Sequence, residues 1–542
     1  MKVPCEPSAV ASVAEYERQA VPTRRVAVGR GPYRGSGVAP DGQPLAGRMP
    51  RFLGFNLRET ILKKLRTFSG YRKALLLLFL LALPVVNPWV RGDGVGYYAY
   101  IRSLLIEHQL DFANDWRSAN ESFVMGRVHA DGKVDANQYT RTGHLDNHFT
   151  VGPSILWAPF VVPVHCAILV LQRVGVNVKA NGFSRPYIVA MALATALYGF
   201  LGLWLSFGLA CSYCQERWAF LATVGIWFGS SLPVYMYFNP SWSHAHSVFV
   251  VALFLWYWHR TRQSRTRAQW AILGLLSGLM LDVYYLNIAV LLIPVLESVR
   301  QYAEKWRRPE RDWAALSRLF TANIIYCFAL LVAFLPTLIT RQIIYGNPLD
   351  LGYSGEWRLK PALLQVLFSS NHGLLTWTPI LNGAILGLFL LRKRDKELAG
   401  YLLISSVVFY VMVSWHTSWD GLSSFGNRFF ISLTPFFVLG LAVLFQRSSE
   451  LLPRRALVIA SSVISLFVLW NLAFIFQWGT HLVPARGPIS WNQMAHNQFS
   501  EVPKQALRDV KAYAINRSAL MQQIEQADVR QLRQWQGANT TK

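Results

Sequence analysis

A carboxylic acid with unusual neighbours follows the first strongly apolar run of the chain. Asp93 stands between Gly92 and Gly94, and Tyr97 and Arg102 come shortly after it. A carboxylate accepts protons, a tyrosine offers a hydroxyl and a stacking face, and an arginine binds anions. The two glycines let the backbone bend and let a bulky ligand approach the acid. An acid among aromatic residues, where an apolar helix leaves the membrane, indicates a site for a polar group carried on a lipid.

The same acid also has an ordinary explanation. Asp is one of the residues preferred at the N-cap of a helix, where its side chain accepts a backbone hydrogen bond. Residues 96–109 have a helical pattern, so Asp93 lies near an expected helix start. From these residues alone, a chemical role and a capping role are equally supported.

Three histidines and one arginine in other segments are further candidates for binding a substrate, namely His148, His244, His372 and Arg428. Arg428 suits a phosphate because its planar guanidinium combines a fixed charge with several donors. The histidines also fit ordinary roles in loops or at the membrane interface, and a helix-end arginine often extends to the interface. The spacing of His144 and His148 favours hydrogen bonding within a loop over a metal site.

The composition indicates a polytopic, all-α membrane protein. Of the 542 residues, 53% are hydrophobic and only 15% are charged, whereas soluble domains average about 25% charged residues. Several nearly uncharged runs reach the length of about 18–20 residues that crosses a bilayer as a helix. The formal charge of +24 lies mainly in short loops between apolar runs, which favours membrane topology signals over nucleic-acid binding.

The elements that must position these residues are about 11 membrane-spanning helices. Four basic segments are expected on the cytoplasmic side: 260–267, 297–316, 392–396 and 447–455. Counting spans from these loops places Asp93 and the other candidate residues together on the outer side. The expected spans are 74–90, 186–210, 218–236, 244–259, two short helices within 269–297, 318–340, 374–391, 398–415, 429–446 and 456–476.

Two segments depart from simple spanning helices. The count leaves no crossing for residues 152–172, and the prolines there fit a broken juxtamembrane helix within a long first external loop, 91–185. Turn signals within 123–150 predict a small hairpin in that loop. Residues 269–297 are expected to break around Asp282, because a carboxylate at this depth needs a cavity or protein partners.

The chain therefore divides into three parts. Residues 1–70 are expected to form a disordered, basic cytoplasmic tail, with 14 Lys and Arg against 5 Asp and Glu up to Lys73. Residues 71–476 form the transmembrane domain. Residues 477–542 are a polar C-terminal tail with an amphipathic, helical pattern over 501–535.

Motifs that would supply energy or a cofactor are missing from the sequence. We find no phosphate-binding P-loop, no GxSxG, no HExxH and no dinucleotide fingerprint. The CxxC spacing of Cys211 and Cys214 has no second pair and no nearby histidine, so zinc or redox chemistry is not favoured. The energy for any reaction must then come from an activated donor held in the membrane.

Five stretches together resemble the polytopic glycosyltransferases of the GT-C superfamily, and in particular the bacterial relatives of protein O-mannosyltransferases and lipopolysaccharide-sugar transferases. The resemblance covers roughly residues 74–446 and is carried by Gly92–Leu104, Asn147–Phe160, Pro240–Ser247, Ser369–Pro379 and Ser424–Phe430. It implies a polyprenyl-phosphate sugar donor and an essential acid in the first external loop, which falls on Asp93. It also implies juxtamembrane helices in that loop, in agreement with 152–172.

One departure from the family pattern concerns the second acid. Many members carry another acid beside the first, whereas Gly94 follows Asp93 here. A bound divalent metal stays open but is not favoured, and Asp146 or Asp282 is left as the candidate second acid.

The resemblance implies transfer of a sugar to an acceptor hydroxyl, with Asp93 as base and with inversion at the anomeric carbon. Arg428, with His372 or His244, would stabilise the leaving phosphate; the acceptor, whether lipid, glycan or protein, is open. The expected place is a bacterial inner membrane, with the N-terminus cytoplasmic and the site outside. The alternative is a transporter or flippase of a lipid-linked polar substrate, but the sequence has no inverted repeat of the kind such proteins show.

Overall fold

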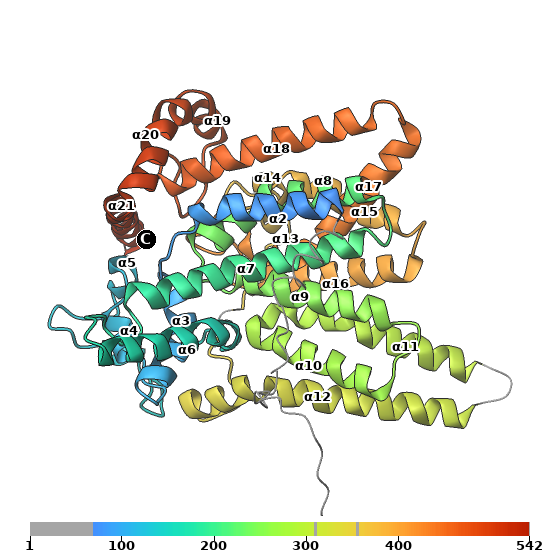
Figure 1. The fold of residues 1–542 in the computed structure, drawn as a ribbon, viewed down its shortest axis with the longest axis horizontal. Helices are drawn as coiled ribbons and strands as arrows, with labels where there is room; N and C mark the ends of the chain where they lie inside the picture. The colour runs from blue at the N-terminus through green and yellow to red at the C-terminus, as the bar shows by residue number, and fades with distance from the viewer. Residues whose placement is uncertain (1–68, 308–311, 354–356, 541–542) are drawn as a thin grey trace, which may run out of the picture. The chain divides into compact units, whose positions relative to one another are not determined.

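The computed structural model describes residues 69–307, 312–353 and 357–540, so the basic segment expected over 1–70 lies almost wholly outside the described residues. Helices make up nearly all the regular structure of the described part (Figure 1). In chain order they are α2 (Gly70–Ala82), η1 (Leu83–Val85), α3 (Asp93–Ile106), α4 (Ala113–Arg117), α5 (Glu121–Val124), η2 (Ala136–Gln138), α6 (Gly152–Arg173), α7 (Arg185–Ala210), α8 (Glu216–Phe228), η3 (Val234–Phe238), α9 (His244–Thr261), α10 (Arg267–Val283), η4 (Tyr285–Leu291), α11 (Leu292–Trp306), α12 (Trp313–Tyr345), α13 (Leu363–Phe368), α14 (Leu374–Trp377), α15 (Ile380–Leu391), α16 (Lys396–Trp415), η5 (Arg428–Leu433), α17 (Thr434–Leu451), α18 (Ala456–Gly479), α19 (Trp491–Phe499), α20 (Glu501–Ile515) and α21 (Arg517–Thr540).

The all-helical membrane fold expected from the sequence is confirmed. Within the described residues, 7 helices are long and apolar enough to cross a membrane by length and composition. Several other expected spans form shorter helices, such as α8 with 13 residues and α15 with 12. The total of about 11 crossings therefore stays a prediction.

Among the seven candidate spans of the described residues, the continuous segment η5–α17, Arg428–Leu451, is the most enclosed, since 89% of its most apolar 18-residue window is buried. It packs against α7, α8 and α15. A side chain on Gly440 would overlap the carbonyl oxygen of Ala384 in α15, so the two backbones pass in direct contact, as small residues allow between membrane helices. Because η5 begins with Arg428, this rigid central helix fixes the position of that arginine.

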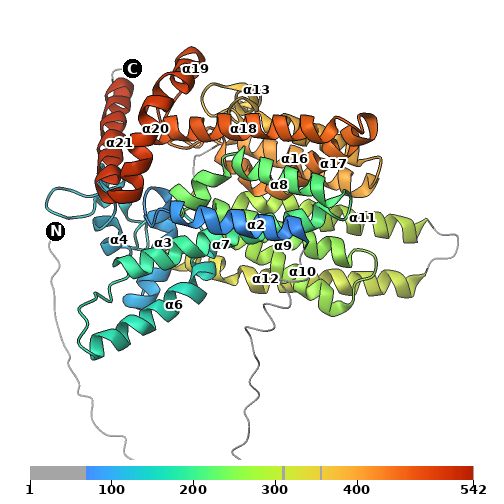
Figure 2. The same ribbon diagram turned by 45° about the horizontal axis from the view of Figure 1, so that its top comes forward.

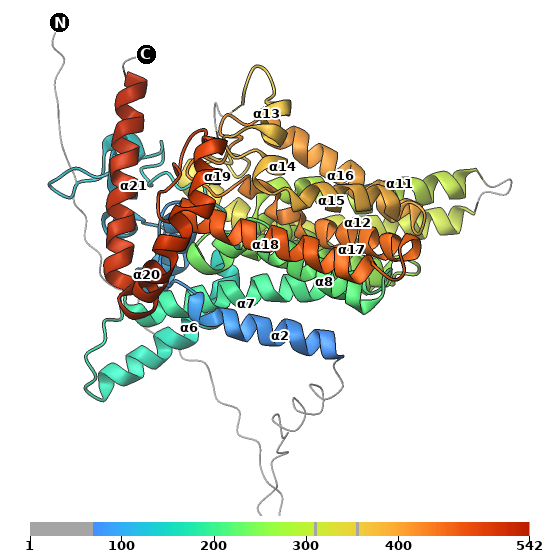
Figure 3. The same cartoon turned by 90° about the horizontal axis from the view of Figure 1, so that it is seen from above.

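Helix α6 covers the segment expected not to cross. Its 22 residues are apolar enough for a span, and it contains Pro159 and Pro163. In Figures 2 and 3, α7 and α18 follow the common direction of the long helices, whereas α6 slants away from that direction near α3. Length and hydropathy class it with the candidate spans, so the juxtamembrane placement of 152–172 stays a prediction.

The chain breaks at Asp282, but not into two half-length helices. Helix α10 ends at Val283, and the 3₁₀ segment η4 follows at once. Together η4 and α11 span 22 residues, enough for a crossing. The break is therefore confirmed, whereas the prediction of two short helices is wrong for the second one, because the chain stays helical through η4 into α11.

The basic loops gather at one end of the helices, as the charge pattern predicts. Arg262 of the 260–267 segment pairs with Asp395, Arg394 pairs with Glu450, and Arg300 pairs with Glu397. The ends that carry Asp93 and Arg428 meet at the opposite side. The two groups of loops are thus separated by the length of the bundle.

The first loop builds its own small core. Val95 and Tyr100 of α3 pack with Phe112, Trp116 and Ile344 in a separate buried cluster. Instead of one hairpin, two short turns form within 123–150, bridged at Val128 to Val134 and at Tyr139 to Leu145. This packed loop holds α3 in place above the spanning helices.

The C-terminal tail is ordered as three helices, α19, α20 and α21. Helix α21 lies across the end of the long helices, next to α5 and the first loop (Figures 1 and 3). The predicted amphipathic helix over 501–535 is thus two helices, divided at Asn516. They bring the end of the chain to the end of the bundle that carries Asp93.

Candidate active site

Asp93 is the first residue of α3. Gly92 occupies the N-cap position with a φ of 52° and makes no side-chain cap. The Asp93 carboxylate instead forms an ion pair with Arg428, with 2.7 Å between Oδ2 and Nη1. The acid therefore faces a cation on the central helix rather than capping its own helix.

The glycines beside Asp93 serve close packing within the protein. A Cβ on Gly94 would overlap the hydroxyl oxygen of Ser241, and one on Gly92 would lie 3.0 Å from the ring of Trp242. We expected these glycines to make room for a ligand, but Ser241 and Trp242 fill that space. Because Gly92 and Gly94 have no side chains, the start of α3 packs directly against the segment before α9.

Replacing Gly94 with Ala should destabilise the protein by about 1–3 kcal/mol, since the added methyl group has no room. Thermal unfolding in detergent measures the loss. Gly400→Ala is the matched control, because nothing lies within 4 Å of its Cβ position in α16. Equal melting temperatures for the two variants would contradict the close packing at Gly94.

Arg428 is held by its ion pair with Asp93, by the ring of Trp242 and by the close backbone at Gly421. Its guanidinium carbon lies 4.2 Å from the centre of the Trp242 ring, and a Cβ on Gly421 would come within 3.2 Å of its Nε. The Nε atom has no hydrogen-bond acceptor among the described residues. Arg428 thus neutralises Asp93 and still has a buried donor available for an anionic ligand.

A cavity of about 220 Å³ opens beside this ion pair. Four arginines line it, Arg91, Arg127, Arg428 and Arg486, together with the carboxylates of Asp93 and Asp528. The positive charges outnumber the negative ones, so the cavity favours an anion such as a phosphate. Burial lowers the pKa of both Arg127 and Arg486, and a ligand phosphate would offset that loss of solvation.

Tyr97 lies one helical turn after Asp93. Its hydroxyl accepts a hydrogen bond of 3.0 Å from Ser243, and its ring contacts Phe149 at 4.9 Å between centroids. Burial and the charge of Asp93 raise the pKa of Tyr97, so it stays protonated. It supports the wall behind the acid and is not among the residues that line the cavity.

Arg102 forms a buried ion pair away from the cavity. Its Nε and Nη2 bind the two oxygens of Asp115, and its Nη1 lies 2.7 Å from Glu107. The side chain is 1% exposed. The sequence suggested a substrate contact, whereas the structure uses this arginine to hold α3 against α4.

Replacing Arg102 with Gln should cost about 3–5 kcal/mol of stability, because it leaves a buried carboxylate unpaired. The KM for the substrate of the folded fraction should stay unchanged. Asp115→Asn is the partner variant and should behave alike in thermal unfolding. A large rise in KM with stability intact would instead return Arg102 to the binding site.

His148 and Asp146 line a second cavity of about 360 Å³, which shares Phe123, Arg127 and Phe149 with the first. Asp146 accepts a hydrogen bond from Tyr345. The two residues are thus neighbours of the Asp93 site without lining its cavity.

His244 and His372 are buried and do not line the Asp93 cavity. The His244 ring packs against Tyr235 and Tyr284. The Nδ1 of His372 lies 2.9 Å from the backbone oxygen of Asp420, and burial lowers the pKa of His372 to about 4. A neutral, enclosed His372 shapes the loop that leads to Arg428 rather than supplying a positive charge.

Asp282 lies apart from both cavities. It is fully buried, and Thr337 donates a hydrogen bond to its carboxylate. A Cβ on Gly152 would overlap its backbone, so the acid marks a close contact between α6 and α10. Among the described residues, no group of three or more His, Cys, Asp or Glu is placed to hold a metal.

Several residues that line the cavity could not be predicted from the sequence. Arg91 is two residues before Asp93, but its basic side chain at a helix end has many ordinary uses. Trp242 lies in the stretch Pro240–Ser247 that carries part of the family resemblance, but no residue there pointed to a contact between its ring and an arginine. Arg486 and Asp528 belong to the C-terminal tail, and only the fold brings them to the acid.

The fold and the site together define an integral membrane protein with a cationic cavity, at one end of the bundle, around a single carboxylate–arginine pair. No protein-family model matches the chain, and no curated protein matches it.

Among solved structures, the chain is similar to the crystal structure of ArnT from Cupriavidus metallidurans in the apo state. The two are 14% identical, the match covers 84% of this chain and 75% of that chain, and the TM-score is 0.43. The functional proposal rests on the residues of the cavity and not on the likeness.

Proposed function

We propose that this protein is a membrane glycosyltransferase that moves a sugar from a polyprenyl-phosphate donor to an acceptor hydroxyl at the outer face of the membrane. One observation carries the proposal: Asp93, ion-paired to Arg428, lines a cavity with three further arginines. Transfer from a phosphate to a hydroxyl requires a base for the hydroxyl and cations for the phosphate. The apolar helices provide the bilayer setting in which a polyprenyl chain is dissolved.

Asp93 acts as the base. As the acceptor oxygen attacks the anomeric carbon, its proton passes to the Asp93 carboxylate, and the bond from that carbon to the phosphate oxygen breaks. The bonding electron pair leaves with the phosphate, so the products are the glycosylated acceptor and polyprenyl phosphate. The Asp93 side chain is 30% exposed, which leaves it accessible from the cavity.

The arginines stabilise the leaving group. A phosphate monoester departs without a proton, so its developing charge must be met by cations that are already in place. Arg428 has five N–H donors in a fixed plane and can serve Asp93 and the phosphate together. Arg91, Arg127 and Arg486 line the same cavity and add to its positive potential.

The reaction should invert the anomeric configuration, because a single carboxylate base gives direct displacement without a glycosyl-enzyme intermediate. The other carboxylate of the cavity, Asp528, is held by Arg91 and His481, so it is not offered as a nucleophile. Proton NMR of the freshly formed product measures the configuration. A retained configuration would require a second nucleophile and would contradict this mechanism.

We place the cavity outside a bacterial inner membrane and the N-terminus inside. The arginines of the 260–267, 392–396 and 447–455 segments lie at the opposite end of the bundle, and positively charged loops are retained on the cytoplasmic side. The apolar outer surface of the long helices then faces lipid. An impermeant thiol reagent should label a cysteine placed at exposed Asp131 from outside the cell.

The test is transfer by the purified protein in proteoliposomes, given a synthetic polyprenyl-phosphate hexose with a radioactive sugar and a membrane extract that contains lipids, glycans and proteins as acceptors. We expect released polyprenyl phosphate and labelled acceptor, both dependent on Asp93. Movement of the intact donor between leaflets, without release of polyprenyl phosphate, would make the protein a transporter instead. The acceptor fraction that carries the label would identify the acceptor as lipid, glycan or protein.

A further inference from the structure

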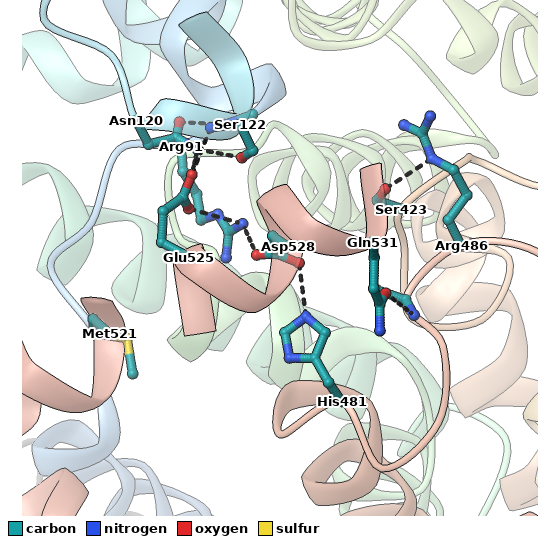
Figure 4. A network of polar contacts seen from close by, with 12 residues as sticks. Arg91, Asn120, Ser122, Ser423, His481, Arg486, Met521, Glu525, Asp528 and Gln531 are labelled. Atoms are coloured by element: carbon teal, nitrogen blue, oxygen red, sulfur yellow. Dashed lines mark hydrogen bonds and ion pairs between the residues drawn. The ribbon is translucent and has the colours of Figure 1, made fainter. Parts of the chain in front are cut away.

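The C-terminal helix α21 supplies part of the wall of the Asp93 cavity. Asp528, Gln531 and Leu532 line the cavity, and the side chain of Gln531 accepts a hydrogen bond from the backbone of Ala485. Figure 4 shows Asp528 between Arg91 and His481, with Gln531 on the side of Arg486. The cavity is therefore bounded on one side by an element outside the membrane bundle.

The contact centres on Arg91, one of the four cavity arginines. Its Nη2 pairs with Asp528, and lies 3.3 Å from a carboxylate oxygen of Glu525. The exposed fractions of the three side chains are between 12% and 16%. The carboxylates of Asp528 and Glu525 thus both pair with the guanidinium of Arg91, which comes two residues before Asp93 in the sequence.

Both carboxylates are held by further groups around the cavity. His481, which has a left-handed φ of 61°, places its Nε2 at 2.9 Å from Asp528. Glu525 accepts hydrogen bonds from the side chain of Asn120 and the backbone of Ser122. Burial acts to raise the pKa of Asp528, but the charge of Arg91 and the hydrogen bond from His481 outweigh it, and the pKa lies below its ordinary value. These donors form a built anion site in which the resident anions belong to α21.

Apolar contacts contribute little to this attachment. Among residues 517–534 of α21, Val529 is the one fully buried side chain, while Leu520, Ile524 and Leu532 stay half-buried. A spanning helix such as α17 buries most of its residues. Separation of α21 therefore exposes less apolar surface than separation of a helix such as α17, and a phosphate that replaces its carboxylates leaves Arg91 paired.

We propose that α21 is a removable cover of the Asp93 cavity. In the closed arrangement, Asp528 and Glu525 pair with Arg91. In the open arrangement, Arg91 binds a phosphate group of the ligand instead. The identity of the ligand rests on the proposed function, whereas the movement of α21 does not. In this exchange Arg91 keeps an anionic partner, since the phosphate takes the place of the carboxylates on the same guanidinium.

The first test locks the cover. The side chains of Asn87 and Met521 touch, with 3.1 Å between Nδ2 and Sδ. The pair Asn87→Cys with Met521→Cys is therefore tested in a background without the five native cysteines, where mass spectrometry verifies that oxidation forms the disulfide. We expect oxidation to lower release of polyprenyl phosphate at least tenfold, and dithiothreitol to restore it. Each single cysteine variant is the control and should not respond. Full activity of the oxidised double variant would overturn the proposal.

The second test weakens the cover without touching Asp93 or Arg428. The double variant Glu525→Gln with Asp528→Asn should lower the KM for the donor several-fold and leave kcat within about twofold, because the phosphate no longer competes with carboxylates. Asp111→Asn with Asp131→Asn, two exposed acids of the first loop, is the charge-matched control. A raised KM would mean that α21 is a fixed part of the binding wall.

The third test needs no catalysis. Hydrogen–deuterium exchange of residues 517–534 should quicken in the double variant, and in the wild type with polyprenyl phosphate, while α17 stays protected. Inorganic phosphate in a parallel sample distinguishes a free anion from the lipid-borne group. Faster exchange without any Asp93-dependent transfer keeps the cover and removes the transferase proposal. Unchanged exchange together with normal transfer does the reverse.

Discussion

Replacing Asp93 with Asn should lower the rate of sugar transfer by about 10²–10⁴-fold, the usual contribution of a positioned general base. The amide is nearly the same size as the carboxylate but cannot accept the proton of the acceptor hydroxyl. Initial rates of polyprenyl phosphate release measure the effect. Expression and membrane insertion should stay normal, because the side chain lies at the cavity and not in the core.

Asp131→Asn is the control for this result. Asp131 is an exposed acid of the same loop whose partner is Lys133, and it should keep the wild-type rate. Near-normal turnover of the Asp93 variant would remove this acid from the catalytic role. In that case the neighbouring cavity with Asp146 and His148 becomes the next place to search for a base.

Replacing Arg428 with Gln should reduce kcat by about 10²–10³-fold, comparable to the loss of one preorganised oxyanion donor. The change removes the cation that faces both Asp93 and the expected leaving phosphate. Steady-state kinetics with the polyprenyl-phosphate sugar separate an effect on kcat from one on KM. Thermal unfolding of the same sample shows whether the central helix is still folded.

Arg447→Gln is the matched control, since Arg447 is exposed at the far end of α17 and pairs with Glu450. It should not change the kinetics. If the Arg428 variant changes only KM, this arginine binds the donor equally in the ground state and the transition state. The proposed stabilisation of the leaving group would then be wrong.

The helical membrane fold follows from the sequence because apolar runs, basic loops and the break near Asp282 are local signals. The positions of the basic loops predicted that Asp93 and Arg428 lie at the same end of the bundle, and the ion pair between them agrees with this prediction. Local signals do not reveal the partners of Arg102, because Asp115 belongs to a loop whose path depends on tertiary contacts. The same limit applies to His372, whose burial follows from loop 416–428 folding over it.

The C-terminal helix α21 shows why the remaining residues of the site could not be predicted from the sequence. An amphipathic, polar segment predicts a surface helix but not the surface on which it lies. Its docking depends on matching Glu525 and Asp528 to Arg91, across most of the chain. No periodicity or spacing encodes a pairing of that range.

The contact between Arg91 and Asp528 joins residues 437 positions apart in the sequence. Ribosomes add about 5–20 residues per second, so Asp93 is synthesised roughly 20 to 90 s before the helix that closes over it. The other lining residues are complete only with Arg486, 42 positions before Asp528, so the cationic hollow stands uncovered for about 2 to 8 s, and anionic lipids can reach it in that time. Synthesis of α21 is therefore the step that ends this exposure, and a ribosome that stalls near the end of the message leaves behind a protein with a permanently open hollow.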